Sequence, residues 1–240
     1  MDAANFEHEV QQCRPQLEAL ARRMVGHPED ARDVVQDALL KATKSLHSFR
    51  GGSSIRTWLY AVTTRTAIDH LRAAKRWNNQ AMVDACDPRA ADSVKAKFSA
   101  DASARFDVNQ HISLCFTCVG RSLEPEQQAA LVLSEVFGLT DREGAEALEL
   151  TEPKYRHLLG DAREHMRSEF ENLCALVNKK GACHQCRILR DLAPSDRNGP
   201  AAPEHLDFDQ RLAKVKATEA AQTGLNTYFF QTLKALQTRR

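Results

Sequence analysis

The sequence predicts an all-α protein built from two small helical domains, a linker between them and a C-terminal helical extension. Three observations lead to this fold class. Apolar residues recur at helical spacing along most of the chain, no segment alternates as a strand would, and glycine or proline interrupts the helical stretches. With 240 residues, 42% hydrophobic and 27% charged, the chain has the composition of a globular protein and room for more than one domain.

The first helical domain is predicted over residues 6–82. Leu17 and Leu20 belong to one apolar helix face, and a second apolar face follows further along the chain. The Gly-His-Pro sequence at 26–28 and the Gly-Gly-Ser-Ser sequence at 51–54 break the pattern. The domain therefore contains at least three helices.

A net charge of +1 hides a local excess of positive charge in this domain. Residues 50–80 hold six basic side chains against one acid, Asp69, and the segment 54–77 interleaves basic, aromatic and hydroxyl residues on a predicted helix. That composition suits single-stranded or melted DNA, since bases stack on aromatic rings while cations follow the phosphates. The alternative is that the apolar members are simply core residues, namely Trp58, Leu59, Val62, Ile68 and Leu71.

A polar linker is predicted over residues 83–110 and a second helical domain over 111–178. In that domain the short helix 139–150 and the helix 152–167 resemble a helix-turn-helix, with Thr151 as N-cap of the second helix. Its polar face offers groups that contact phosphates or base edges, whereas an ordinary hairpin with a solvated basic face is the alternative. The candidate DNA-binding residues here are Thr151, Lys154, Tyr155, Arg156, His157 and Arg163.

A cysteine-containing segment and linker follow at 179–204, and the helical tail is predicted at 205–240. The N-terminus has no signal-peptide pattern and no stretch reaches transmembrane length, so we expect a cytoplasmic protein that does not bind membranes. No catalytic constellation or phosphate-binding glycine loop is found, so we do not expect an enzyme. The seven cysteines are then expected to be reduced.

Two groups of sulfur and nitrogen ligands bracket the second domain. His111, Cys115 and Cys118 fall on one face of a predicted helix, and Cys183 and Cys186 follow the helix-turn-helix. Imidazole and thiolate are preferred ligands of tetrahedral zinc, so the two groups are candidate ligands of one zinc ion. The alternatives are that the cysteines are small core residues or that one pair is a redox switch.

Taken together, residues 10–172 resemble the extracytoplasmic-function (ECF) group of bacterial sigma factors. The segment 31–39, Ala-Arg-Asp-Val-Val-Gln-Asp-Ala-Leu, is similar to the family's helix that docks on the clamp of the polymerase largest subunit. Asp33 and Asp37 are four residues apart on one helix face, where a solvated acidic surface is the alternative. The resemblance implies a polymerase-binding set of Asp33, Val34, Gln36, Asp37 and Leu40.

The same resemblance assigns roles to the two DNA-binding segments. Residues 56–72 are similar to the family's segment that melts and captures the minus-ten element, and 123–131 with the helix-turn-helix are similar to its reader of the minus-thirty-five element. The chain departs from the family at Thr64-Arg65, at Gly144 and in the reading helix at Leu158, Gly160 and Asp161, which puts the promoter sequence in doubt. The implied minus-ten set is Arg56, Trp58, Tyr60, Thr64, Arg65, Asp69, Arg72, Lys75 and Arg76.

The resemblance implies a sigma factor that directs RNA polymerase to promoters. Its expected partners are core RNA polymerase, through the clamp and the flap of the second-largest subunit, promoter DNA in duplex and melted form, and an anti-sigma factor. Metal-responsive ECF relatives with cysteine-bearing extensions suggest metal or redox control through the cysteines. The competing hypotheses are a stand-alone metal- or redox-sensing repressor and an adaptor whose C-terminal helix binds another protein.

Overall fold

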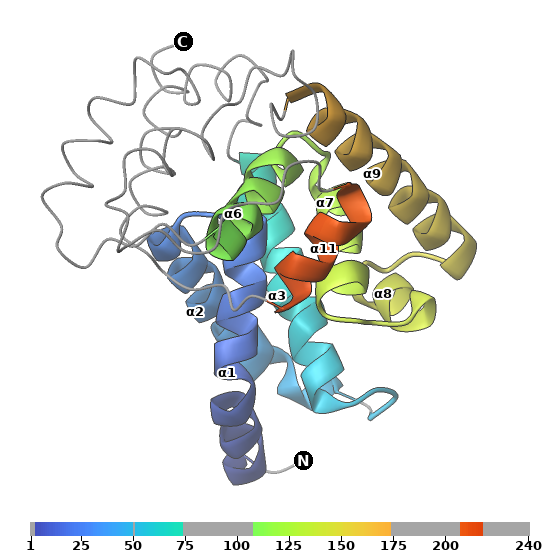
Figure 1. The fold of residues 1–240 in the computed structure, drawn as a ribbon. Helices are drawn as coiled ribbons and strands as arrows, with labels where there is room; N and C mark the ends of the chain where they lie inside the picture. The colour runs from blue at the N-terminus through green and yellow to red at the C-terminus, as the bar shows by residue number, and fades with distance from the viewer. Residues whose placement is uncertain (1–2, 50, 74–107, 174–206, 218–240) are drawn as a thin grey trace, which may run out of the picture. The chain divides into compact units, whose positions relative to one another are not determined.

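The computed structural model describes residues 3–49, 51–73, 108–173 and 207–217 (Figure 1). Within these ranges the regular structure is helical and contains no strand, which confirms the predicted all-α class. No described helix is long and apolar enough to cross a membrane. The elements are α1 (Ala3–Val25), α2 (Pro28–Ser45), a 3-10 turn (Leu46–Ser48), α3 (Ile55–Ala73), α6 (Val108–Gly120), α7 (Pro125–Leu131), a π-helical turn (Val132–Val136), α8 (Asp141–Ala147), α9 (Glu152–Leu173) and α11 (Phe208–Ala217).

The break between α1 and α2 occurs where the sequence predicts it. Gly26 has φ +84°, a left-handed conformation that glycine adopts without a steric penalty, and its amide donates to the Arg22 carbonyl at 2.9 Å. His27 then caps α2, with its Nδ1 accepting from the Glu29 amide at 3.3 Å. Pro28 occupies the first turn, where its missing N–H is not needed.

The described residues fall into two compact units whose limits differ from the predicted domain boundaries. The first unit contains the described residues up to 73 together with 123–163, which include α7, α8 and the first half of α9. The second contains 108–122, 164–173 and 207–217. The described residues of the predicted second domain, 111–178, are thus divided between the two units. Helix α6 begins at Val108, within the last residues of the predicted linker, and the rest of that linker lies outside the described residues.

The core of the first unit is a bundle of α1, α2 and α3. All three helices pack against one another, and apolar side chains from each of them are buried, whereas Trp58 is half-buried. Removing such side chains from water is the main contribution to folding free energy. The buried apolar set includes Leu17, Leu20, Met24, Val34, Val35, Ala38, Leu59, Val62, Ile68 and Leu71.

Helix α3 is buried on more than the side that faces this bundle. It also packs against α7 and α8, which lie beside it in Figure 1. On the α1 side of the unit, Gln128 of α7 is 2% exposed, and its side-chain amide donates to the Met24 carbonyl at 2.8 Å. That bond satisfies a buried polar group and ties α7 to the end of α1.

The second unit is built around α6 and the C-terminal helix α11. Asp207 caps α11 by accepting from the Gln210 amide at 2.8 Å, and α11 packs against α6. Arg211 is 2% exposed, and its guanidinium lies 5.3 Å from the centre of the Phe170 ring. These residues show that residues 208–217 of the predicted tail are helical and packed. The rest of the predicted tail, with Leu225, Phe229, Leu233 and Leu236 at helical spacing, lies outside the described residues.

Candidate functional site

The exposed side of α2 carries the predicted polymerase-docking residues. Asp33, Gln36 and Asp37 are exposed, and Leu40 is 53% exposed, which is high for a large apolar side chain. Residues three and four positions apart share a helix face, so these side chains form one continuous surface. Val34 is different, because it is 2% exposed and belongs to the bundle core. Its assignment to a docking surface is therefore corrected.

Three members of the predicted minus-ten set, Arg56, Trp58 and Asp69, lie on α3 and differ in their surroundings. Arg56 is exposed, while Trp58 is half-buried, with its ring 5.3 Å from that of Phe49. Asp69 is exposed and accepts from Lys41 of α2 at 3.4 Å. Trp58 therefore helps to fix the loop before α3 and keeps only part of its ring available. Lys75 and Arg76 lie outside the described residues.

The other members of that set lie where α3 meets the segment 123–149. Tyr60 is 8% exposed, and its ring contacts that of Phe137 edge-on at 5.4 Å. Burial raises the pKa of the Tyr60 hydroxyl. Thr64 is 0% exposed, and its hydroxyl has no hydrogen-bond partner among the described residues. This part of the predicted DNA-binding surface is therefore closed in the structure.

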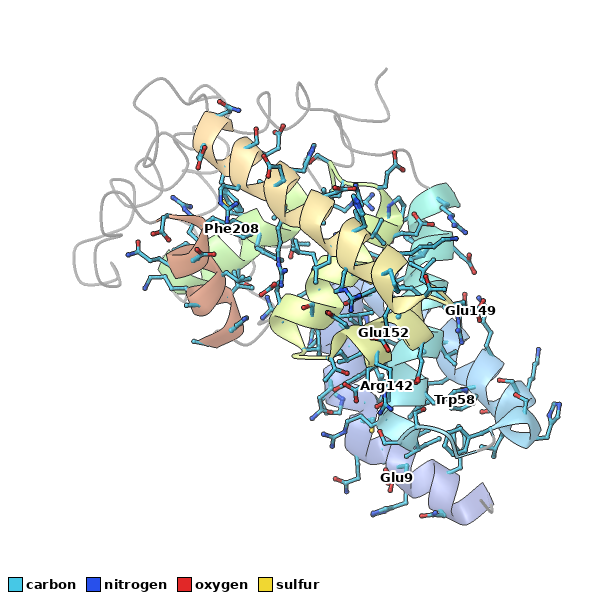
Figure 2. The ribbon with its side chains drawn as sticks, turned by 90° about the vertical axis from the view of Figure 1, so that its right-hand side faces the viewer. Glu9, Trp58, Arg142, Glu149, Glu152 and Phe208 are labelled. Carbon is cyan, nitrogen blue, oxygen red and sulfur yellow. The ribbon has the colours of Figure 1, made fainter. Side chains whose placement is uncertain are left out.

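Two arginines of α3 are paired with acids of the same segment. Arg65 donates from Nη1 to Oε1 of Glu149 at 2.7 Å, and Arg72 forms an ion pair with Glu126. Figure 2 shows Glu149 at the turn before α9, next to α3. Glu149 adopts φ +57°, a conformation that side chains other than glycine seldom take. The sequence alone did not identify Glu126 or Glu149, although their charge complements the basic stretch.

The first helix of the helix-turn-helix, α8, is capped by Thr140 and Glu143. Thr140 accepts from the Glu143 amide at 3.3 Å, and the Glu143 carboxylate accepts from the Thr140 amide at 2.9 Å. The carboxylate also accepts from the Thr140 hydroxyl at 2.8 Å, and the two bonds that it accepts from Thr140 lower the pKa of Glu143. The predicted short helix is therefore present and begins at Asp141.

Gly144 and Tyr155 form a close packing pair between α8 and α9. A methyl group at Gly144 would lie 2.3 Å from Cζ of Tyr155, well inside van der Waals contact. Tyr155 is 0% exposed, and its hydroxyl donates to the Ala130 carbonyl at 3.1 Å. The tyrosine therefore connects three elements from within the core. Its assignment as a DNA-contacting residue is corrected.

The start of α9 presents the rest of the predicted minus-thirty-five set to solvent. Thr151 precedes the helix, and its carbonyl accepts from the Tyr155 amide at 2.9 Å. Lys154, Arg156 and His157 are exposed. Arg163 instead donates from Nε to Glu135 at 2.7 Å, and Glu135 is 8% exposed. Arg163 thus holds α9 against the π-helical turn, a role that its position on the polar face did not suggest.

Only part of the predicted metal-ligand set lies in the described structure. Cys118 is buried and Cys115 is half-buried on α6. His111 belongs to α6, but its side chain is outside the described part, as are Cys183 and Cys186. Among the described residues no group of three or more histidine, cysteine, aspartate or glutamate side chains is arranged to hold a metal ion.

Comparison with known proteins gives two matches, in the order of the two predicted segments. The family model of Sigma-70 region 2 matches residues 10–77, and that of Sigma-70, region 4 matches residues 114–166. Together they cover about half of the chain. The first match contains α2 and α3, and the second contains the helix-turn-helix.

Similar curated proteins include three bacterial sigma factors. The ECF RNA polymerase sigma factor SigG of Mycobacterium tuberculosis is 28% identical over an alignment of 178 positions, which covers 68% of this chain and 48% of SigG. This chain therefore spans about half the length of that relative. The RNA polymerase sigma-H factor of Pseudomonas aeruginosa is 28% identical over 68% of this chain and 84% of its own length. The ECF RNA polymerase sigma-E factor of Escherichia coli is 29% identical over 60% and 75%.

Proposed function

Because the chain belongs to the sigma-70 family of RNA polymerase sigma factors, in its ECF group, we propose that it directs core RNA polymerase to specific promoters. The observation that carries this proposal is the order of the two family matches, each on helices with an exposed functional face. The chain then acts in the cytoplasm as a binding subunit, and the polymerase performs the chemistry.

Docking on core polymerase is assigned to the exposed face of α2. Asp33 and Asp37 supply paired carboxylates for basic groups of the clamp, and the exposed Leu40 supplies an apolar contact beside them. Charged groups at an interface guide encounter and orientation, while a desolvated apolar side chain contributes affinity. A merely solvated acidic surface would lack such an exposed leucine beside its acids.

Promoter DNA is assigned to two surfaces. The α3 residues Arg65 and Arg72, with Tyr60 and Thr64, bind the melted minus-ten strand through phosphate contacts and base stacking. The start of α9 enters the major groove at the minus-thirty-five element, where Lys154, Arg156 and His157 reach phosphates or base edges. A stand-alone repressor would have no use for the α2 face, and the family matches do not favour that alternative.

The docking assignment is tested by charge reversal. We expect Asp33→Arg with Asp37→Arg to abolish co-purification with core polymerase and run-off transcription from a promoter that the wild type uses. Glu7→Arg with Glu171→Arg is the matched control, because both acids are exposed and lie outside the two family matches. Intact polymerase binding by the first double variant would overturn the assignment.

Metal control through the cysteines is a second part of the proposal. It is supported by the ligand types and spacing of His111, Cys115, Cys118, Cys183 and Cys186, which suit zinc. We expect purified protein to contain about one zinc per chain. Cys115→Ser with Cys118→Ser should lose the zinc, whereas Cys13→Ser, at a buried cysteine of α1, should retain it. Full-length protein without zinc after purification in its presence would contradict this.

A further inference from the structure

We propose that Asp141 of α8 and Glu152 of α9 position the Arg156 guanidinium as the reader of a guanine edge in the major groove. Asp141 then contributes to sequence specificity through Arg156, as a positioning residue that does not itself touch DNA. This inference rests on the proposed function of α9 and assigns the chemistry of its contacts. Arg156 is the base reader of this surface, and Lys154 is a phosphate contact.

Two carboxylates approach the same nitrogen of Arg156 from two helices. Its Nη1 lies 3.7 Å from Oε2 of Glu152, four residues earlier on α9, and 4.0 Å from Oδ2 of Asp141, the first residue of α8. Both distances exceed that of a hydrogen bond, so the acids attract the guanidinium without engaging its donor hydrogens. A guanidinium has five N–H donors, and a guanine edge needs two of them for O6 and N7. The restricted side chain therefore keeps its capacity to read a base.

The neighbouring cation Lys154 has different surroundings. It lies two residues before Arg156 and is also exposed, but among the described residues no acid is within ion-pair distance of its ammonium group. A mobile point charge suits a phosphate, whereas the planar guanidinium suits a bidentate contact with O6 and N7. An exposed arginine loses rotamer entropy when it binds, and acids that restrict it beforehand reduce that loss. The ion pairs therefore single out Arg156 as the base reader.

The packing of α8 against α9 fixes the acid of one helix relative to the arginine of the other. Tyr155, the neighbour of Arg156, is 0% exposed and packs against Gly144 of α8. Burial, and then the Asp141 carboxylate, raise the pKa of the Tyr155 hydroxyl, so that carboxylate lies close to the contact between the helices. The backbone at Arg156 and the start of α8 are therefore held in one geometry before DNA binds.

The two ion pairs are too exposed to contribute much to stability. Side-chain exposure is 55% for Arg156, 42% for Asp141 and 47% for Glu152, and water and salt screen such pairs. Their effect is expected in the complex with DNA, where specificity also comes from repulsive elements. The two carboxylates disfavour a phosphate beside Arg156 but accept a neutral base edge there. The acids therefore direct this arginine to a base and away from the DNA backbone.

The test uses holoenzyme reconstituted from core polymerase and the full-length chain. Selection from a randomised duplex library gives the sequence that the wild type prefers, and the same selection with Arg156→Ala identifies the guanine that depends on this arginine. The probe is that duplex with this guanine replaced by 7-deazaguanine, which pairs normally but lacks the N7 acceptor. The measured quantity is the ratio of affinities for the unmodified and the modified duplex. In the wild type this ratio should be about tenfold, because the lost hydrogen bond has a charged donor.

Removing the two acids should lower this ratio. Asp141→Asn with Glu152→Gln should reduce it about twofold to tenfold, the effect of losing the restriction of one long side chain. The same two changes in an Arg156→Ala background should leave the ratio unchanged, since the acids act through the arginine. Glu146→Gln is the matched control, because Glu146 is an exposed acid of α8 that forms no ion pair with Arg156 within the described structure.

The outcomes separate this inference from the proposed function. If Lys154→Ala and Arg156→Ala both leave the selected sequence and its affinity unchanged, the proposed reading role of α9 fails. If Arg156→Ala abolishes discrimination against 7-deazaguanine while the double acid variant retains it, the positioning fails and the proposed function stands. A selected sequence without a guanine that depends on Arg156 would overturn the inference as well. So would an equal change of affinity for both duplexes, which is what competition with DNA or a purely structural role of the acids predicts.

Discussion

The two predicted DNA-binding surfaces, on α3 and at the start of α9, differ in how far their side chains are exposed to solvent. Lys154, Arg156 and His157 of α9 are exposed to solvent, and Arg156 also forms long ion pairs with Asp141 and Glu152, at 4.0 and 3.7 Å. Tyr60 and Thr64 of α3 are buried, and Arg65 is bound to an acid of the same chain. The surface proposed to read duplex DNA is thus exposed, while the surface proposed to bind melted DNA is covered. On the proposed function, the residues for duplex DNA are accessible in the free protein, whereas those for melted DNA are not.

The largest effect is expected from a substitution that disturbs the packing of α9 against α8. Gly144→Ala would place a methyl group 2.3 Å from the Tyr155 ring, so we expect a loss of about 1–3 kcal/mol in the free energy of unfolding. Denaturant titration measures this. Gly160→Ala is the matched control, since nothing lies within 4 Å of its added methyl. That change should stabilise α9 by about 0.5–1 kcal/mol, and equal effects of the two variants would contradict the packing account.

An exposed charge at the start of α9 should be removable without loss of stability. Lys154→Ala should weaken binding to duplex promoter DNA uniformly across sequences and lower the salt-dependence slope by about 1. Its free energy of unfolding should stay within about 0.5 kcal/mol of wild type, because the side chain is exposed. Fluorescence anisotropy at several salt concentrations measures the slope. Lys44→Ala, at an exposed lysine of α2, should leave it unchanged.

On the covered surface of α3, a substitution should raise the free energy of unfolding. Thr64→Val replaces a buried, unpaired hydroxyl with a methyl group of similar size, so the free energy of unfolding should rise by up to about 1 kcal/mol. Thr66→Val is the control, because the Thr66 hydroxyl donates to the Val62 carbonyl at 2.9 Å. That variant should be destabilised. Destabilisation by Thr64→Val would mean that its hydroxyl has a partner after all.

The smallest expected effect is a pH dependence of the α8 cap. Hydrogen bonds from Thr140 lower the folded-state pKa of Glu143 from its ordinary value of 4.5. Its stabilising contribution is therefore complete above pH 4.5 and is lost as the pH falls through the folded-state pKa. Thermal unfolding from about pH 6 to about pH 3 should show wild type losing its advantage over Glu143→Gln.

Local features of the fold could be predicted from the sequence because their causes are local. Gly26 and Pro28 end one helix and begin the next, and Ser54 accepts from the Thr57 amide at 3.0 Å at the start of α3. Each of these signals acts within a few residues of itself. The exposed acids of α2 and the exposed cations of α9 follow from helical periodicity in the same way.

The partners of α3 could not be predicted, since they depend on long-range packing. Arg65 and Glu149 are 84 positions apart, and nothing near Arg65 indicates that an acid will meet it. Tyr155 was predicted as a member of the DNA-binding set, but the absence of a side chain at Gly144 makes the space that buries it. The glycine that departs from the family pattern was the available clue to that pocket.

The aromatic contacts of α11 have a practical consequence for anyone preparing parts of this protein. The Arg167 guanidinium lies 5.6 Å from the centre of the Phe208 ring, and Phe170 is 6.2 Å from the same ring. A fragment that ends at residue 166, where the region 4 match ends, would divide α9 and lack Arg167, Phe170 and Phe208. It would also strip α6 of the helix packed on it. A soluble fragment should therefore retain residues 167–173 and 207–217, beyond the boundary that sequence similarity marks.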